Sequence, residues 1–234
     1  MAEVVKLGSL YIGGRLQESI VQYTRGKISI GPTVPGAEIR WIKVNGLLIA
    51  DRCLCTTISW EHLDAQGLVF GTMVRLNDCW YICRCLEVGS EDYRRSEWSD
   101  AVKATSDSDE LWHWSGFLFW GQERVLDRCA ACRGLDPAMF WDYGFTGGQH
   151  PWIGWRPVLE PMGRNTRSPE AMLGKPVKLF GPNMIPLSGT VLEVDDYDIL
   201  VKPKTELPKD WAWGKKADNG VLIDKNSIAW IKAV

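Results

Sequence analysis

The stretch Gly154–Pro161, GWRPVLEP, places one arginine among an aromatic residue, two aliphatic residues and two prolines. The apolar residues on both sides of Arg156 predict a buried strand, in which Trp155 and Val158 pack into the core. A buried guanidinium is stable only when it is hydrogen-bonded, usually to an acid. The candidate acids are Glu123, Asp142 and Glu160. We therefore interpret this stretch as the structural strand that closes a domain, not as a catalytic motif.

Length and charge limit the possible classes of protein. A chain of 234 residues can form one large domain or two small ones. Its net charge of −2 argues against a protein that coats DNA or RNA, which would carry a basic excess. The first residues do not resemble a signal peptide, and no apolar run is long enough to span a membrane. We expect a cytoplasmic protein without a membrane partner, located in the host cytoplasm if a phage encodes it.

Tryptophan is the unusual residue of this sequence. There are thirteen tryptophans, and seven of them lie between Trp98 and Trp155. Each brings a large apolar ring and one N–H donor. A core of this size needs fewer, so the excess predicts an aromatic-lined pocket or groove.

The seven cysteines are expected to be free thiols in a reducing compartment. Cys53 and Cys55 alternate along the chain, as do Cys83 and Cys85, so in strands each pair points to one face and is buried. Cys129 and Cys132 have the spacing of zinc ligands, but a second pair with this spacing is missing. We predict no metal and no cofactor.

The N-terminal part of the chain has the patterns of short strands and two helices. Asn45-Gly46 predicts a hairpin, and a second hairpin is expected over Thr72–Leu76 and Trp80–Val88. Capping serines predict helices over Ser59–Gln66 and Ser96–Ser106. From Asp107 to Pro161 the pattern is irregular, which is typical of functional loops.

The polar segment after Pro161 predicts a domain boundary. We place the first domain at residues 1–162, a linker at 163–171 and a second domain at 172–234. The second domain shows about five short strands with clean alternation, which predicts a small all-β barrel.

The segments Val177–Lys202 and Val221–Ile231 make this barrel resemble the Sm-like fold of the bacterial RNA chaperone Hfq. Gly189 would supply the bend of the second strand, and residues 195–198 (Asp-Asp-Tyr-Asp) would form the acidic turn. Residues 224–228 stand at the second Sm motif, although no histidine follows Lys225. The resemblance implies an oligomer formed by the barrel, and it leaves RNA binding as an alternative. Lys209, Trp211, Trp213, Lys215 and Lys216 have the aromatic and basic character for nucleic acid.

The segment Arg128–Pro161 resembles the formylglycine-generating-enzyme-like branch of the C-type lectin fold. Arg133-Gly134 stands where this family has an Arg-Gly step, and residues 154–156 stand at its Gly-Phe-Arg step. The resemblance covers Gly71–Pro161 and extends to short proteins of phages and prophages. It implies an α+β class for the chain, with a C-type-lectin-like domain followed by the Sm-like barrel. The family's oxidoreductases use a copper-binding cysteine pair near the domain end, which Cys129 and Cys132 do not match in position, so an enzyme is only a minor alternative.

We expect a non-enzymatic binding protein of the phage or prophage type that captures a small nucleotide-like molecule. Aromatic rings stack on planar ligands, and arginines bind phosphate or carboxylate. Such a protein could sequester an immune signal of the host. The alternative is a tail or virion module that binds a glycan. The predicted ligand-binding residues are Trp112, His113, Trp114, Trp120, Arg124, Arg128, Arg133, Trp141, Tyr143, Gln149, His150 and Trp152.

Overall fold

The structure is a computed structural model, and it describes residues 2–77, 79–91, 95–162, 169–181, 186–207, 211, 213–228 and 230–233. The chain divides into two compact units, Met1–Pro161 and Met162–Val234. The predicted domains span 1–162 and 172–234. Of the predicted linker, residues 163–168 lie outside the described residues, and residues 169–171 belong to a short 3-10 helix, η1 (Pro169–Met172).

The predicted α+β class is wrong, because the protein is mostly β. Strands hold 50% of the residues and helices 11%. Within the described residues the α-helices are α1 (Trp60–Ala65), α2 (Glu97–Ala104) and α3 (Asp109–Trp112). Helices of one or two turns bury too little apolar surface to form a layer, so the sheets build the core. None of the described helices has the length and apolar character needed to cross a membrane.

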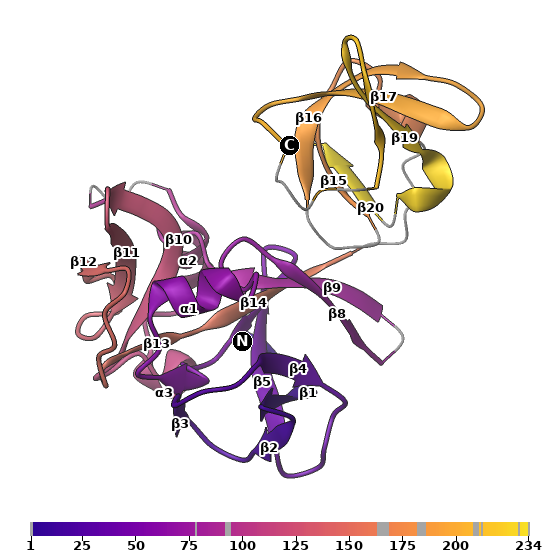
Figure 1. Ribbon diagram of the computed structural model, residues 1–234. Helices are drawn as coiled ribbons and strands as arrows, with labels where there is room; N and C mark the ends of the chain where they lie inside the picture. Colours follow the sequence, from indigo (N-terminus) through magenta and orange to yellow (C-terminus); the bar gives the residue numbers. More distant parts are fainter. Residues whose placement is uncertain are drawn as a thin grey trace. The chain divides into compact units, whose positions relative to one another are not determined.

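The larger sheet of the N-terminal unit has the order β2-β1-β5-β6-β14-β9-β8, and β4 pairs with β1 (Figure 1). Its strands are β1 (Glu3–Ile12), β2 (Arg15–Gln17), β4 (Ile28–Gly31), β5 (Glu38–Val44), β6 (Leu47–Ala50), β8 (Thr72–Leu76), β9 (Cys79–Cys85) and β14 (Pro157–Pro161). Two predicted hairpins are confirmed. Strands β5 and β6 meet at Asn45 and Gly46, which both have positive φ angles (50° and 80°), and β8 pairs with β9. Asp78 of the second turn lies outside the described residues.

The second sheet of this unit has the order β12-β11-β10-β13-β7-β3. Its strands are β3 (Val21–Gln22), β7 (Cys55–Thr56), β10 (Leu118–Leu126), β11 (Cys129–Gly134), β12 (Trp141–Phe145) and β13 (Ile153–Trp155). The prediction of an irregular segment from Asp107 to Pro161 is therefore wrong for most of its length. The segment of β11 (CAACRG) holds small residues and an arginine, and that of β10 (LFWGQERVL) has Gly, Gln, Glu and Arg at its centre, so both lack the β-branched alternation that marks a strand.

The predicted closing stretch links the two sheets. β13 lies in the second sheet between β10 and β7, whereas β14, two residues later, lies between β6 and β9 in the larger sheet. Trp155 and Val158 are fully buried, as predicted. The chain crosses from one sheet to the other at Arg156, which is also fully buried. This stretch therefore fixes the relation between the two sheets.

The predicted acid partner of Arg156 is wrong. Its guanidinium donates instead to two backbone carbonyls, that of Asp51 (3.5 Å) and that of His113 (3.2 Å). It also lies over two rings, with its central carbon 4.9 Å from the centroid of Trp98 and 4.8 Å from that of Phe119.

The three candidate acids have other partners. The Glu160 carboxylate accepts from Arg84 (3.3 Å), and that of Glu123 accepts from the amides of Val88 and Gly89. The carboxylate of Asp142 accepts from the amide of the next residue, Tyr143 (2.8 Å). Within the described residues, Arg156 is therefore held by backbone carbonyls and aromatic rings, with no carboxylate as a direct partner.

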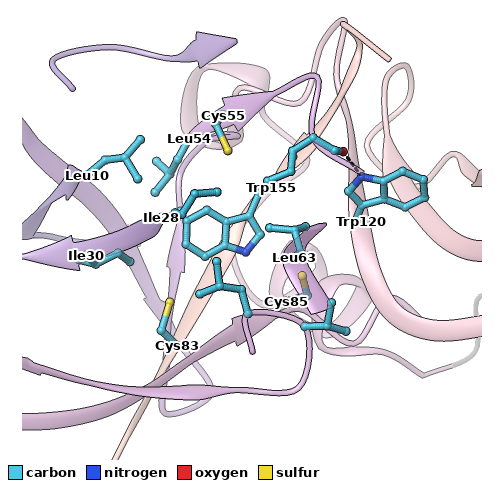
Figure 2. Packing of buried hydrophobic residues seen from close by; sticks show 14 of the residues in the cluster. Leu10, Ile28, Ile30, Leu54, Cys55, Leu63, Cys83, Cys85, Trp120 and Trp155 are labelled. Atoms are coloured by element: carbon cyan, nitrogen blue, oxygen red, sulfur yellow. Dashed lines mark hydrogen bonds between the residues drawn. The ribbon is translucent and has the colours of Figure 1, made fainter. Parts of the chain in front are cut away.

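Trp155 lies at the centre of one core cluster of the N-terminal unit. Figure 2 shows its indole surrounded by leucine, isoleucine and cysteine side chains from several strands. The neighbouring Trp120 donates from Nε1 to the carbonyl of Ile58 (2.8 Å). A second cluster gathers around Trp98 and Trp112, whose rings meet edge to face. Much of the tryptophan excess is thus core.

The two predicted helices are confirmed, and their ends follow the local sequence. α1 begins after Ser59, whose hydroxyl accepts from the amide of His62. α2 begins after Ser96, which forms a capping box with Ser99. Trp98, Ala101 and Val102 form the buried face of α2, as expected from their spacing.

The C-terminal unit has one antiparallel sheet with the order β18-β19-β17-β16-β15-β20. Its elements after η1 are β15 (Pro176–Phe180), β16 (Leu187–Val194), β17 (Asp198–Pro203), β18 (Lys215–Ala217), β19 (Gly220–Asp224), the 3-10 helix η2 (Lys225–Ser227) and β20 (Trp230–Ala233). Figure 1 shows these strands curling around a common interior. At Gly189 a Cβ atom would lie 2.4 Å from the carbonyl oxygen of Lys202, so this close approach requires glycine.

Candidate functional site

A groove of about 530 Å³ opens on the N-terminal unit. Its apolar lining includes Leu10, Ile39 and Leu54, which are all buried core residues. Its charged lining consists of Glu18, Glu38, Arg40, Asp51 and Arg52. A concave site with an apolar floor and a few polar groups is the usual form of a small-molecule site. We call it the Arg40–Arg52 groove.

Asp51 organises one end of this groove. It directly follows β6, and its amide donates to the carbonyl of Arg40 on β5 (3.0 Å), which fixes the backbone. Its carboxylate, 2% exposed, accepts from Nε and Nη2 of Arg52 at 2.8 Å each. Nε of Arg40 lies 3.4 Å from the same carboxylate. The paired hydrogen bonds with Asp51 raise the pKa of Arg52, which is therefore charged.

His113 joins this cluster through Arg52. Its Nε2 lies 3.1 Å from Nη2 of Arg52. A guanidinium can only donate, so Nε2 must accept, and the proton of the neutral imidazole is on Nδ1. That Nδ1 lies 3.7 Å from Oδ2 of Asp51, which is too far for a hydrogen bond. His113 also has a left-handed backbone (φ 44°, ψ 49°), a conformation that costs energy in residues other than glycine.

The cluster carries more positive than negative charge. The guanidiniums of Arg40, Arg52 and Arg156 lie around Asp51, which supplies one carboxylate. Burial lowers the pKa of Arg156, and this effect is only partly offset by the neighbouring Cys53 and Asp51. Nδ1 of His113 and Nε of Arg156 are buried without a hydrogen-bond partner among the described residues. Neither residue is among those that line the groove, so the positive charge that an anion in the groove would meet comes from Arg40 and Arg52.

Three of the predicted ligand-binding residues belong to the core. Trp112, Trp120 and Arg133 are fully buried. The guanidinium of Arg133 donates to the carbonyls of Val88 (2.9 Å), Ser90 (3.1 Å) and Met139 (2.6 Å), so it joins the segment 88–90 to Met139. These three side chains offer no surface to a ligand.

The other predicted residues are spread over several elements of the N-terminal unit. His113 lies at the cluster described above. Trp114 packs against the second core cluster, and the guanidinium of Arg124 covers the ring of Trp60 (4.8 Å). The remaining six, Arg128, Trp141, Tyr143, Gln149, His150 and Trp152, lie on β12, on the segment that follows it and on the turn before β11.

Strand β12 presents an exposed aromatic surface. Trp141, Tyr143 and Phe145 alternate along the strand and so share one face. Tyr143 is 47% and Phe145 is 45% exposed. The rings of Trp141 and Tyr143 are 5.8 Å apart, and the guanidinium of Arg128 lies 4.7 Å from the centroid of Phe145. We call Arg128, Trp141, Tyr143 and Phe145 the β12 aromatic surface.

The turn before β13 adds a separate stacked pair. The rings of His150 and Trp152 lie 5.2 Å apart at an angle of 27°. Trp152 is 50% exposed, and Gln149 beside it is also exposed.

The cysteine predictions can be compared with the strands. Cys53, Cys55, Cys83 and Cys85 are all buried, as expected. Cys129 and Cys132 lie on β11, in continuous register with β12. Residues three apart in a strand point to opposite faces, so these two thiols do not form a zinc-binding pair. Within the described ranges, no three or more His, Cys, Asp or Glu side chains are placed to hold a metal ion.

The spot predicted for nucleic acid in the C-terminal unit has buried tryptophans. Trp211 and Trp213 are 8% and 9% exposed and belong to the core of that unit, with ring centroids 5.1 Å apart. Lys209 lies outside the described residues, whereas Lys215 and Lys216 are exposed on β18. Buried rings are not available for stacking on bases.

The sequence reasoning missed Arg40, Asp51 and Arg52. One signal was present, because the charged pair Asp51-Arg52 directly follows the apolar run Leu47–Ala50. Charged residues at the end of a buried strand are candidates for a site. Comparison with known proteins gives no direct identification, since no family model, curated protein or solved structure matches this chain.

Proposed function

We propose that the N-terminal unit is a non-enzymatic binding module, which captures a small nucleotide-like molecule in the Arg40–Arg52 groove. The observation that carries this proposal is the excess of positive charge around Asp51 at one end of a groove with an apolar floor. The positive end suits one phosphate or carboxylate, and the floor suits a planar ring. The volume of about 530 Å³ is within the usual range of ligand sites.

The state of the charged groups favours binding over catalysis. Asp51 accepts both hydrogen bonds of Arg52 and lies beside Arg40, so its carboxylate oxygens are already occupied by donors of the chain itself. One serine–histidine pair that could suggest a nucleophile is Ser59 and His62, whose Oγ and Nδ1 lie 2.6 Å apart. Ser59 is 1% exposed, and its hydroxyl already accepts from the amide of His62 as a helix cap.

The narrower form of this proposal is sequestration. A phage-type protein that removes a nucleotide signal of the host needs an anion-binding groove and no reacting group. The groove is compatible with this role, which depends on the identity of the ligand.

Mass spectrometry and calorimetry together test the binding proposal. Denaturing release from the purified protein should yield a small anionic molecule, and added nucleoside monophosphates should bind to emptied protein. Arg40→Gln should weaken binding at least about tenfold, the value of one hydrogen bond to a charged group. Lys43→Gln is the matched control, because Lys43 is on the same strand but pairs with Glu3 outside the groove. Equal binding by both variants, or none by the unmodified protein, would contradict the proposal.

The β12 aromatic surface favours a second candidate function, which is binding of a glycan. Exposed rings such as Tyr143 and Phe145 can stack on the apolar faces of sugars. An array of immobilised glycans tests this candidate. Tyr143→Ala should lose glycan binding and keep the binding of anions in the groove, whereas Arg40→Gln should show the reverse.

A further inference from the structure

We infer that the ligand of the Arg40–Arg52 groove is dipolar, with one compact anionic group at Arg40 and an amino or other N–H donor group at Glu38. This inference rests on the proposed function and narrows its class of ligand. It is carried by the opposite charges that a single strand, β5, presents to the same groove.

The geometry of β5 sets the spacing of these charges. Glu38 and Arg40 are two positions apart, so their side chains point to the same face of the strand, and both line the groove. Two strand residues span about 7 Å. No ion pair joins the two side chains in the described part of the chain. The side chain of Arg40 is 46% exposed, and its Nε lies 3.4 Å from Oδ2 of Asp51.

The carboxylate of Glu38 has the capacity to accept a hydrogen bond from a ligand. One carboxylate oxygen accepts from the amide of Gly36 (2.9 Å). Hydrogen bonds from its own amide and from Gly36 lower the pKa of Glu38, so it remains charged near neutral pH. A carboxylate has about four acceptor positions, which leaves capacity for the donor group of a ligand.

The remaining acids argue against a polyanion. Glu18 also lines the groove and is exposed. Arg52 already directs two nitrogens at Asp51. A chain of phosphates that extended from Arg40 would therefore meet Glu38 and Glu18, whose like charges repel it. A monophosphate that carries an exocyclic amine avoids this repulsion and satisfies both ends.

Matched pairs of nucleotides test the inference. Adenosine and inosine monophosphate differ mainly at one position, where adenine has an amine and hypoxanthine has a carbonyl. Cytidine and uridine monophosphate form a second such pair. We expect calorimetry to show that the amine-bearing member of one pair binds at least about tenfold more tightly, and that adenosine triphosphate binds more weakly than the monophosphate.

Variants separate the two ends of the groove. Glu38→Gln keeps an oxygen that can accept from Gly36, so the fold should be unchanged, and it should reduce the preference for the amine to less than about threefold. Arg40→Gln should weaken all monophosphates, and Lys43→Gln should change nothing. If all monophosphates bind equally and Glu38→Gln has no effect, the dipolar inference is overturned while the proposed function stands. If no nucleoside monophosphate binds at millimolar concentration, the dipolar inference and the proposed function are both overturned for nucleotides.

Discussion

Asp51 is the residue on which the charged cluster depends. Its carboxylate is 2% exposed and is the direct acid partner of both Arg40 and Arg52. We expect Asp51→Asn to lower the free energy of unfolding by about 1.5–3 kcal/mol, because it weakens the charge-assisted hydrogen bonds from Arg52, whose side chain is partly exposed. Urea denaturation measures this change.

The matched control is an exposed ion pair. Glu3 lies 3.0 Å from Lys43, and both side chains are more than half exposed (61% and 53%). Glu3→Gln should cost at most about 1 kcal/mol. If Asp51→Asn cost no more than this control, the cluster would not be the buried, charge-dependent unit described above.

The buried thiols predict how stability changes with pH. Burial raises the pKa of Cys53, Cys55, Cys83, Cys85 and Cys132. The unfolded chain therefore loses these protons first, above about pH 8.5. The free energy of unfolding should be insensitive to these thiols below that pH. Above it, each thiol should lower that free energy by up to about 1.4 kcal/mol per pH unit.

Denaturation curves between pH 7 and 10 test this prediction. A stability that rises above pH 8.5 would show that the sign is wrong.

At the scale of elements, two serines at helix starts make a matched pair. Ser96 caps α2 and forms reciprocal hydrogen bonds with Ser99. Ser108 precedes α3 but makes no capping hydrogen bond with its side chain. Ser96→Ala should cost about 1 kcal/mol, whereas Ser108→Ala should cost only a few tenths. Thermal denaturation of both variants compares them, and equal losses would show that the capping box of α2 contributes little.

Elements with local signals could be predicted from the sequence, and elements without them could not. The turn at Asn45-Gly46 and the caps at Ser59 and Ser96 depend on nearby residues, so the hairpin and both helices were found. The strands from β10 to β13 depend on partners far away in the chain. β10, for example, pairs in parallel with β13, 35 positions later at Leu118 and Ile153. Such pairing leaves little trace in local pattern, and this is why the class was mispredicted.

The same reasoning applies to the candidate site. The pair Asp51-Arg52 was visible after an apolar strand, but its contact with His113 spans 61 positions, and Arg156 is 105 positions from Asp51. Tryptophan gave a misleading signal, because a tryptophan in a core and a tryptophan in a pocket cannot be distinguished in a single sequence. Trp112 and Trp120 proved to be core, whereas Trp152 is exposed.

At the scale of the whole molecule, each unit has its own core. The buried residues of the two core clusters of the N-terminal unit lie within residues 7–159. Those of the C-terminal cluster begin at Met172. We therefore expect fragments 1–161 and 162–234 to fold separately, with the smaller fragment less stable because small domains bury less surface. Circular dichroism and thermal melts of both fragments test this. An unfolded N-terminal fragment would contradict it.

Strand β12 lies at the end of its sheet, and its outer edge could accept another strand. The amide of Tyr143 donates to the side chain of Asp142 (2.8 Å), so the chain itself occupies a donor that an incoming strand would need. Exposed aromatic strands at sheet edges are common starting points for aggregation. Asp142 therefore occupies one of the edge positions that an incoming strand would use, and it opposes edge-to-edge pairing of this aromatic strand.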